Sequence, residues 1–377
     1  MKTKMLCGGR ILSLLIALCL LAGAFSRCGS DSSVSADKVK ITLCEPGDSV
    51  SVHTGLQGAY LEEPYGMVLS YAQGKSERSK PEPICFTWGV EADESFGEPT
   101  GYIFRCGLKP DLSDATAVTL TEPEYKMTNF LLGQKYYWSV TAVYPSGEYT
   151  GEIADFTTET TAPRNLDVSG VTNVRDMGGW KTENGGTVKQ GLLFRCGRLN
   201  ENDSDQKKIT DEGIQTMLGT LGIKSDIDLR KDGENGGITV SPLGDGVKYY
   251  HCPMGYDGDI MAINTEMLKN VLVILSDESN YPAIFHCSIG TDRTGMVAFV
   301  INALLGVSAD DLYRDYSYSN FGDIGGSRDP ANIKHYEETL LSAEGDSLSE
   351  CTYNWLLGIG MTAEQLDSII RILGPES

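Results

Sequence analysis

The sequence predicts a multidomain chain in which an all-β sandwich over residues 39–160 precedes an α/β domain over residues 165–377. In the first part, short runs of alternating apolar and polar residues are separated by turns rich in Gly, Pro and Asp. That period of two is typical of antiparallel strands in a sandwich. After Pro163, apolar runs with strand character alternate with runs of helical period, which predicts a central sheet flanked by helices.

Residues 1–24 have the pattern of a secretory signal peptide. A short cationic stretch precedes an apolar run over residues 11–21, and the small residues Ala22, Gly23 and Ala24 follow it. Because the apolar run is too short to span a bilayer comfortably, we expect cleavage and export rather than a retained membrane anchor.

Residues 25–38 are expected to form a polar linker. Cys28 stands where a lipid-modified cysteine would lie, and sequence rich in Ser, Gly and Asp follows it, as in many tethers. Arg27, directly before it, argues the other way, since lipoproteins have a small residue at that position. A lipid on Cys28 and an unmodified Cys28 therefore both stay open.

The composition excludes several partners and cofactors. The formal net charge of −21 argues against nucleic acid or an anionic membrane surface as a partner, because both would be repelled. The four histidines, His53, His251, His286 and His335, show no metal-ligand spacing, so we expect neither a metal nor another cofactor. The ten cysteines show no framework spacing, which leaves any disulfide pairing open.

The sandwich strands are expected near residues 84–88, 102–106, 136–143 and 156–158. Trp88 and the run Leu-Gly-Gln-Lys-Tyr-Tyr-Trp at 132–138 resemble the B-strand tryptophan and the approach to strand F of a fibronectin type III domain. The resemblance implies that Trp88 and Tyr136 lie in a sandwich core rather than in a carbohydrate site. Residues 39–80 precede the first clear strand, and we expect an extra hairpin or an extended linker there.

In the α/β part, the predicted strands are residues 223–229, 249–252 and 283–285. The predicted helices are residues 205–221, 261–276, 294–305 and 362–373.

One segment of the α/β part carries the residue types of an anion-binding site. It follows an apolar strand and precedes a helical run, and it reads His286, Cys287, Ser288, Ile289, Gly290, Thr291, Asp292, Arg293, Thr294, Gly295. A tight loop between a strand and a helix gathers backbone N–H groups at the helix N-terminus, where they bind an anion.

Each residue type in this segment has a chemical reason. A helix N-terminus lowers the pKa of a thiol, so Cys287 is the candidate nucleophile. The planar guanidinium of Arg293 is suited to donate hydrogen bonds to two oxygens of a phosphate. Thr294 is placed to donate a hydrogen bond to the sulfur, and Gly290 and Gly295 permit close backbone approach.

These ten residues resemble the Cys-x5-Arg tyrosine phosphatase superfamily, and specifically its atypical bacterial members with an H-C-x-x-G-K-D-R-T-G loop. Further segments that match this family are residues 173–179, 191–197, 226–230 and 315–320. The resemblance implies a phosphocysteine intermediate on Cys287. It also implies that substrate binds along the loop, at Ser288, Ile289, Gly290, Thr291, Arg293 and Gly295. One departure is Thr291, which stands where the family has lysine.

The residue that protonates the leaving group stays open. Asp292 matches the loop aspartate of the family, but a carboxylate at this place also suits the first turn of a helix. Asp257 and Asp259 lie upstream, where many relatives carry their acid on a mobile loop, and both also suit a solvated turn. Tyr256 is expected either to line the pocket or to pack.

Three further residues are expected to support the site. His286 is predicted to brace the loop by hydrogen bonding rather than to transfer protons. Arg230 and Asp176 are predicted to form a structural ion pair near the pocket.

Together these features predict an exported phosphomonoester hydrolase. It is expected to be a protein-tyrosine phosphatase, with dual specificity that also includes phosphoserine and phosphothreonine as the wider option. The expected partner is a phosphorylated protein or a small phosphomonoester, at an extracellular or cell-surface location. The β-sandwich or a lipid on Cys28 would attach the protein to a surface. Two alternatives stay open: an inositol phosphate or phosphoinositide phosphatase, and a phospho-ligand-binding surface protein without activity. The net charge and Thr291 count against the former.

Overall fold

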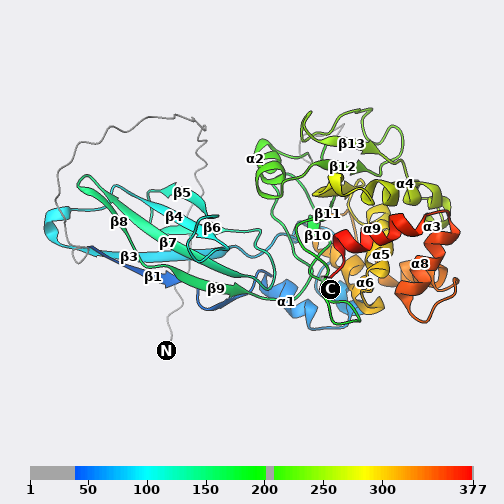
Figure 1. The fold of residues 1–377 in the computed structure, drawn as a ribbon, viewed down its shortest axis with the longest axis horizontal. Coiled ribbons are helices and arrows are strands. Elements are labelled where there is room, and N and C mark those ends of the chain that lie inside the picture. Colours follow the sequence, from blue (N-terminus) through cyan, green and yellow to red (C-terminus); the bar gives the residue numbers. More distant parts are fainter. Residues whose placement is uncertain (1–38, 201–207, 376–377) are drawn as a thin grey trace. The chain divides into compact units, whose positions relative to one another are not determined.

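The computed structural model describes residues 39–200 and 208–375 (Figure 1). The predicted signal peptide, the linker with Cys28 and the first residues of the helix predicted at 205–221 lie outside these ranges. Contacts join the residues from Val39 onward into a single unit. Among the described residues, no helix has both the length and the apolar character needed to cross a membrane.

The first part contains two β-sheets. The three-stranded sheet has the order β1-β3-β6, and the six-stranded sheet has the order β2-β9-β7-β4-β5, with β8 beside β7. All neighbours are antiparallel except β2 and β9. The strands are β1 (Val39–Glu45), β2 (Ser49–Val50), β3 (Ile84–Ala92), β4 (Gly101–Gly107), β5 (Thr116–Leu120), β6 (Glu124–Met127), β7 (Lys135–Tyr144), β8 (Gly147–Thr150) and β9 (Ala154–Thr158).

Aromatic side chains fill the space between the two sheets. The Phe86 ring lies 4.8 Å from Phe104 and 5.0 Å from Trp138, measured between centroids. Trp88 and Tyr136 are buried, which confirms their predicted place in a core. These rings come from alternate positions of facing strands, so the period-two pattern of the sequence is the cause of this core.

The expectation for residues 39–80 is wrong. β1 pairs with β3, and the segment after β2 contains the helix α1 (Gly55–Leu61) and the 3-10 helix η2 (Tyr65–Ser70). Their aromatic residues pack on the α/β part: Tyr65 stacks on Tyr313 at 5.0 Å, and Tyr60 lies 5.7 Å from Phe321. The segment that contains α1 and η2 therefore packs against the α/β part through these aromatic rings.

The second part has a five-stranded sheet in the order β10-β11-β14-β12-β13. β10 is antiparallel to β11, and the other neighbours are parallel. The strands are β10 (Arg175–Asp176), β11 (Leu193–Cys196), β12 (Ser225–Asp228), β13 (Lys248–His251) and β14 (Ala283–His286). The three predicted strands are confirmed as β12, β13 and β14, whereas β10 and β11 were not predicted.

The helices of this part are α2 (Asp211–Gln215) with a π-helical turn (Thr216–Thr220), α3 (Ile260–Ile263), α4 (Thr265–Leu275), α5 (Asp292–Leu304), α6 (Ala309–Tyr318), α7 (Lys334–Leu340), α8 (Leu348–Gly358) and α9 (Ala363–Leu373). Three short 3-10 segments join them: η6 (Glu278–Asn280), η7 (Ser319–Phe321) and η8 (Pro330–Ile333). The four predicted helices are confirmed with shifted ends, while α6, α7 and α8 were not predicted.

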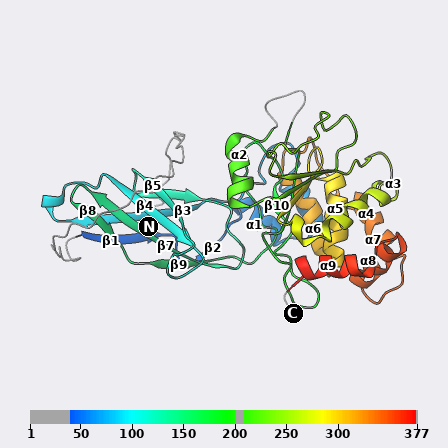
Figure 2. The ribbon, with the colours of Figure 1, turned by 45° about the horizontal axis from the view of Figure 1, so that its top comes forward.

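The sheet has a hydrophobic core on each face. Phe285 of β14 packs into the core that contains α5, and its neighbour Ile284 packs with Met217 and Leu221 beside α2. Figures 1 and 2 show α2 apart from the group formed by α5, α6, α8 and α9. This packing fixes the carboxyl end of β14 against the amino end of α5, where the predicted anion loop lies.

Candidate active site

Residues 287–291 connect β14 directly to α5 in a tight loop. The turn depends on Gly290, whose φ is +71° and whose place would put a Cβ 2.5 Å from the carbonyl carbon of Cys196. Any side chain there would clash with the end of β11. Gly295 is also close to a neighbour, with the Tyr316 ring 3.0 Å from where its Cβ would lie.

Cys287 lies at the base of the loop and is 1% exposed. Burial alone would raise the pKa of its thiol, but the Arg293 charge opposes this, as do hydrogen bonds from the Thr294 side chain and from the backbone of Thr294 and Ile289. The net effect lowers the pKa of Cys287 below its ordinary value. Thr294 Oγ1 is buried and has no hydrogen-bond partner among the described residues, which leaves its proton available to the neighbouring sulfur. A lowered pKa favours the thiolate, which is the nucleophilic form of the sulfur.

Buried side chains hold the loop carbonyls from the inner side. Asn173 Nδ2 donates to the carbonyl oxygen of Gly290 at 3.0 Å and to that of Ile289 at 3.3 Å. Arg195 Nη2 donates to the Gly290 carbonyl at 2.8 Å. With the carbonyls bound on this side, the backbone N–H groups of the loop are free to face the pocket.

Asp315 organises these supports. Its carboxylate accepts from Arg175 Nε at 3.1 Å and from Arg195 Nη1. Burial would raise the pKa of Asp315, but Arg175 and Arg195 hold it below the usual range. Arg175 in turn donates to Asn173 Oδ1. The family-like segments 173–179, 191–197 and 315–320 thus meet beneath the loop.

His286 is fully buried between two carboxylates. Its Nε2 lies 3.0 Å from Asp226 Oδ1, and its Nδ1 lies 3.9 Å from Asp228 Oδ1. Burial would lower the pKa of His286, yet the two carboxylates raise it above its usual value. The imidazole lies between these carboxylates at the strand ends, and its predicted role as a hydrogen-bonding brace of the loop stays a prediction.

The predicted ion pair between Arg230 and Asp176 is wrong. Arg230 pairs with Asp228 instead, with 2.7 Å between Nη2 and Oδ2. Burial opposes ionisation of Asp228, but His286 and Arg230 lower its pKa to about 2. Asp228 is the last residue of β12 and Arg230 follows it by two positions, so this pairing is local in the sequence.

Asp176 has a different partner, Arg164, at 2.7 Å. Its oxygens also accept from the backbone nitrogen of Gly178 at 2.8 Å and from that of Gly191 at 2.7 Å. Asp176 therefore joins the turn after β10 to the segment before β11, and it is a structural residue that does not line the pocket.

Arg293 is 4% exposed and reaches across to the loop that joins β12 and β13. Its Nη1 lies 2.7 Å from Glu234 Oε2, and its Nη2 donates to Ser288 Oγ at 3.2 Å. The ring of Tyr256 lies 5.2 Å from the guanidinium carbon. Glu234 was not predicted from the sequence, because it lies 59 positions from Arg293 and only the fold brings the two together.

These groups surround a pocket of about 260 Å³, the Cys287 pocket. Its lining residues are Glu234, Tyr256, Cys287, Ser288, Ile289, Asp292, Arg293 and Arg328. Three predicted substrate-binding residues, Gly290, Thr291 and Gly295, do not line it. Thr291 is fully buried, with Asn173 Nδ2 3.3 Å from its hydroxyl, and the two glycines face the protein interior.

The three candidate acids occupy different environments. Asp292 lines the pocket, and both its oxygens accept from Arg328, Oδ1 from Nε at 3.0 Å and Oδ2 from Nη2 at 3.3 Å. Asp259 caps α3 through the backbone nitrogens of residues 261 and 262, which is a structural role. Asp257 is exposed and makes no hydrogen bond or ion pair among the described residues.

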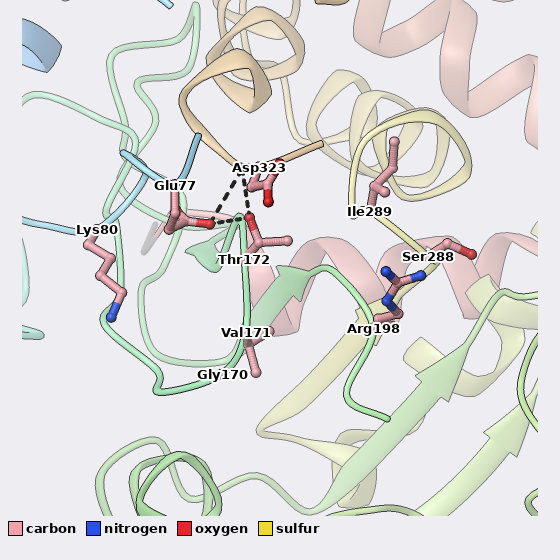
Figure 3. Close-up of a pocket in the computed structure, with 9 residues that line it drawn as sticks. All are labelled: Glu77, Lys80, Gly170, Val171, Thr172, Arg198, Ser288, Ile289 and Asp323. Atoms are coloured by element: carbon pink, nitrogen blue, oxygen red, sulfur yellow. Dashed lines mark hydrogen bonds between the residues drawn. The ribbon is translucent and has the colours of Figure 1, made fainter. Parts of the chain in front are cut away.

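A second pocket of about 210 Å³ adjoins the first and shares Ser288 and Ile289 with it (Figure 3). Figure 3 shows Arg198 beside these two residues and Glu77 across from them, near Thr172. Glu77 Oε2 accepts from Thr172 Oγ1, so the segment before β3 reaches the edge of the loop.

The described residues contain no cluster of three His, Cys, Asp or Glu side chains that would hold a metal ion. No disulfide joins the seven cysteines within them, Cys287 included.

Known proteins resemble this chain over its second part. The model of the tyrosine phosphatase family matches residues 166–365. A protein of Cupriavidus necator, named as a candidate tyrosine-protein phosphatase, is 25% identical over 175 residues, which are 40% of this chain. The chain spans 61% of the length of that relative.

Solved structures also match, among them the following two. The core catalytic domain of the PP-IP phosphatase SIW14 from S. cerevisiae is 20% identical, with a TM-score of 0.29, over 43% of this chain and 90% of that one. The tyrosine phosphatase OH1 from the Orf virus is 14% identical, with a TM-score of 0.20, over 45% of this chain and 83% of that one.

Proposed function

The chain belongs to the tyrosine phosphatase family, and we propose that it is an exported phosphomonoester hydrolase that acts on phosphotyrosine through a phosphocysteine on Cys287. The observation that carries this proposal is the electrostatic setting of one sulfur. A buried thiol with a lowered pKa stands at the end of a strand, against an arginine that follows in the first turn of the next helix. That combination supplies both a nucleophile and a cation for phosphoryl transfer.

In the first step, the Cys287 thiolate forms a bond to phosphorus as the bond from phosphorus to the leaving oxygen breaks. Arg293 and the backbone N–H groups of the loop bind the equatorial oxygens, on which charge is spread. The leaving oxygen receives a proton from a carboxylic acid. Asp292 is the aspartate that lines the Cys287 pocket, so we assign this role to it rather than to Asp257 or Asp259.

In the second step, water attacks the phosphocysteine, and the carboxylate takes the proton of that water. The bond between sulfur and phosphorus breaks, and inorganic phosphate leaves. The hydrogen bond from Thr294 stabilises the thiolate as a leaving group in this step. The cycle restores both the thiolate and the carboxylic acid without a cofactor.

The first part of the chain is proposed to be a fibronectin type III-like domain that attaches the enzyme to a surface. Its support is the two-sheet core and the hydrogen bond from the backbone nitrogen of Leu131 to Tyr136 Oη at 2.9 Å. A tyrosine hydroxyl bound to upstream backbone is a recurring corner of such sandwiches. Export rests on the signal-peptide pattern of residues 1–24, and a lipid on Cys28 would add a second anchor.

The test is phosphate release by the purified, reduced protein from four substrates: a phosphotyrosine peptide, a phosphoserine peptide, a phosphoinositide and inositol hexakisphosphate. The proposal predicts the highest kcat/KM on the phosphotyrosine peptide and no release by Cys287→Ser. Preference for an inositol substrate would move the assignment to that substrate class. Binding of phosphopeptide without release, by folded protein, would make it a phospho-ligand-binding protein.

A further inference from the structure

Arg328 is a cation at the mouth of the Cys287 pocket that the mechanism above does not use. It follows η7 in the loop that leads to η8, and its side chain lines the pocket together with Asp292 and Arg293. The Cys287 thiolate is one of the charges that raise the pKa of Arg328, after the hydrogen bond to Asp292. A second positive charge therefore faces the reacting sulfur from outside the loop.

The backbone of Arg328 is fixed in place from both sides. Its nitrogen donates to Asn320 Oδ1 at 2.8 Å, and its carbonyl accepts from Asn320 Nδ2 at 2.9 Å. Asn320 is 1% exposed, so this clamp is part of the buried fold. The side chain beyond the clamp is 28% exposed, and its guanidinium contacts Asp292 and, at 3.2 Å from Nη1, the carbonyl oxygen of Gly326. The arrangement places a partly exposed guanidinium on a fixed backbone, and partly exposed contacts of this kind cost little to exchange.

The loop lacks a cation at position 291, where the tyrosine phosphatase family has lysine. Thr291 stands there, and its side chain is buried against Asn173 rather than directed into the pocket. Arg293 is shared with Glu234, whose carboxylate neutralises part of its charge. A phosphate dianion in the pocket thus needs a further positive partner, and Arg328 is the other cation among its lining residues.

We infer that Arg328 is a second phosphate-binding residue, which exchanges Asp292 for the substrate phosphate and so frees Asp292 to become the proton donor. This inference rests on the proposed function. In the state described here, both Asp292 oxygens are occupied by Arg328. A phosphate dianion in the pocket competes for the same guanidinium, because it carries more charge than one carboxylate.

The exchange has a chemical consequence for Asp292. Once the guanidinium has moved to the phosphate, the carboxylate faces an anion instead of a cation, which favours its protonated form. The proton comes from solvent and passes to the leaving oxygen as the P–O bond breaks. The acid is thereby formed only where substrate is bound.

The test is a double-mutant cycle of oxyanion binding in the inactive Cys287→Ser background. Calorimetry with inorganic phosphate and with phenyl phosphate would compare this parent with added Arg328→Ala, added Asp292→Asn, and both. We expect Arg328→Ala to weaken binding about tenfold, as for the loss of one charge-assisted hydrogen bond. Asp292→Asn should tighten binding several-fold, and this gain should vanish in the double variant.

A purely structural role for Arg328 predicts different results. Binding unchanged by Arg328→Ala, or an equal gain from Asp292→Asn with and without Arg328, would overturn the inference, since the gain would then be direct electrostatics. Arg328→Lys should keep part of the affinity, which separates lost charge from lost folding. Arg371→Ala, which breaks an exposed pair with Glu278, is the matched control and should change nothing. Because the cycle needs no turnover, it stands apart from the test of activity.

Discussion

The two sides of the 287–293 loop are built in opposite ways. On the inner side, the carbonyls are held by Asn173 and Arg195, whose partners Arg175 and Asp315 are buried as well. On the pocket side, the rim consists of partly exposed residues from three loops and from the first turn of α5: Glu234, Tyr256, Arg328 and Asp292.

The contrast between the inner support and the rim separates two tasks. Buried ion pairs with several hydrogen bonds each have one arrangement, so they fix where the loop N–H groups point. Partly exposed pairs cost little to open, so they are suited to changing partners when substrate arrives. The inner support fixes the conformation of the loop, whereas the ion pairs of the rim can change partners when substrate binds.

The inner support should show the largest effect of a single change. Asp315→Ala leaves Arg175 and Arg195 buried without their common carboxylate, and we expect a loss of about 3–5 kcal/mol in the free energy of unfolding. Urea unfolding followed by circular dichroism measures it. Glu278→Gln, which breaks the surface pair with Arg371, should cost below about 1 kcal/mol. Equal costs for both changes would remove the distinction between support and rim.

At the rim, Asp292→Asn should reduce kcat without unfolding the protein. We expect a loss on the order of 10²-fold for phenyl phosphate, whose leaving oxygen needs a proton, and little loss for 2,4-dinitrophenyl phosphate. Steady-state rates on the two esters measure this. If both rates fell alike, Asp292 would not be the acid, and Asp257→Asn would be the next variant.

The sulfur itself depends on Thr294. Thr294→Val removes a hydrogen bond that lowers the pKa of Cys287, so that pKa should rise. At a given pH near neutrality less thiolate is then present, and the alkylation profile moves to higher pH. Iodoacetamide labelling of the Cys287 peptide, followed by mass spectrometry against pH, reads this directly. A profile that stayed in place would show that Thr294 makes no bond to the sulfur.

The smallest effect is expected where the first part of the chain reaches the site. The backbone nitrogen of Asn173 donates to Ser79 Oγ at 3.1 Å, and Ser79 is bound to Glu77. Ser79→Ala leaves that N–H group unpaired, which costs about 1 kcal/mol and should lower kcat/KM by a few-fold. Ser342 is exposed, so the control variant Ser342→Ala should leave kcat/KM unchanged. An unchanged kcat/KM in Ser79→Ala would show that the contact between Asn173 and Ser79 contributes to stability but not to catalysis.

The loop was predictable because its chemistry is contiguous in the sequence. A nucleophile, two glycines and an arginine stand within ten residues, between a strand pattern and a helix pattern, and Cys287 and Arg293 meet as expected. The rim was not predictable in this way. Glu234 lies 59 positions from Arg293, and Arg328 lies 36 positions from Asp292, so only the fold brings each pair together.

Some of the elements that escaped prediction carry buried polar residues. β11 has Arg195 as the third of its four residues, so its sequence lacks a purely apolar run. The helix α6 does carry Leu312, Tyr313 and Tyr316 at helical spacing on its buried side, and this signal was missed. The helix α1 was missed because its short, partly exposed sequence resembles a loop. Its capping box at Thr54 and Gln57 was the available signal. The wrong pairing of Arg230 with Asp176 has the same origin, since sequence does not say which buried charges are neighbours.

The most direct test of the account is to trap the intermediate. Wild-type protein mixed with a phosphotyrosine peptide is quenched in acid during turnover, and its peptides are analysed by mass spectrometry. The account predicts phosphate on the peptide that contains Cys287 and on no other. Turnover without phosphate on Cys287, or with phosphate on a different residue, would contradict it.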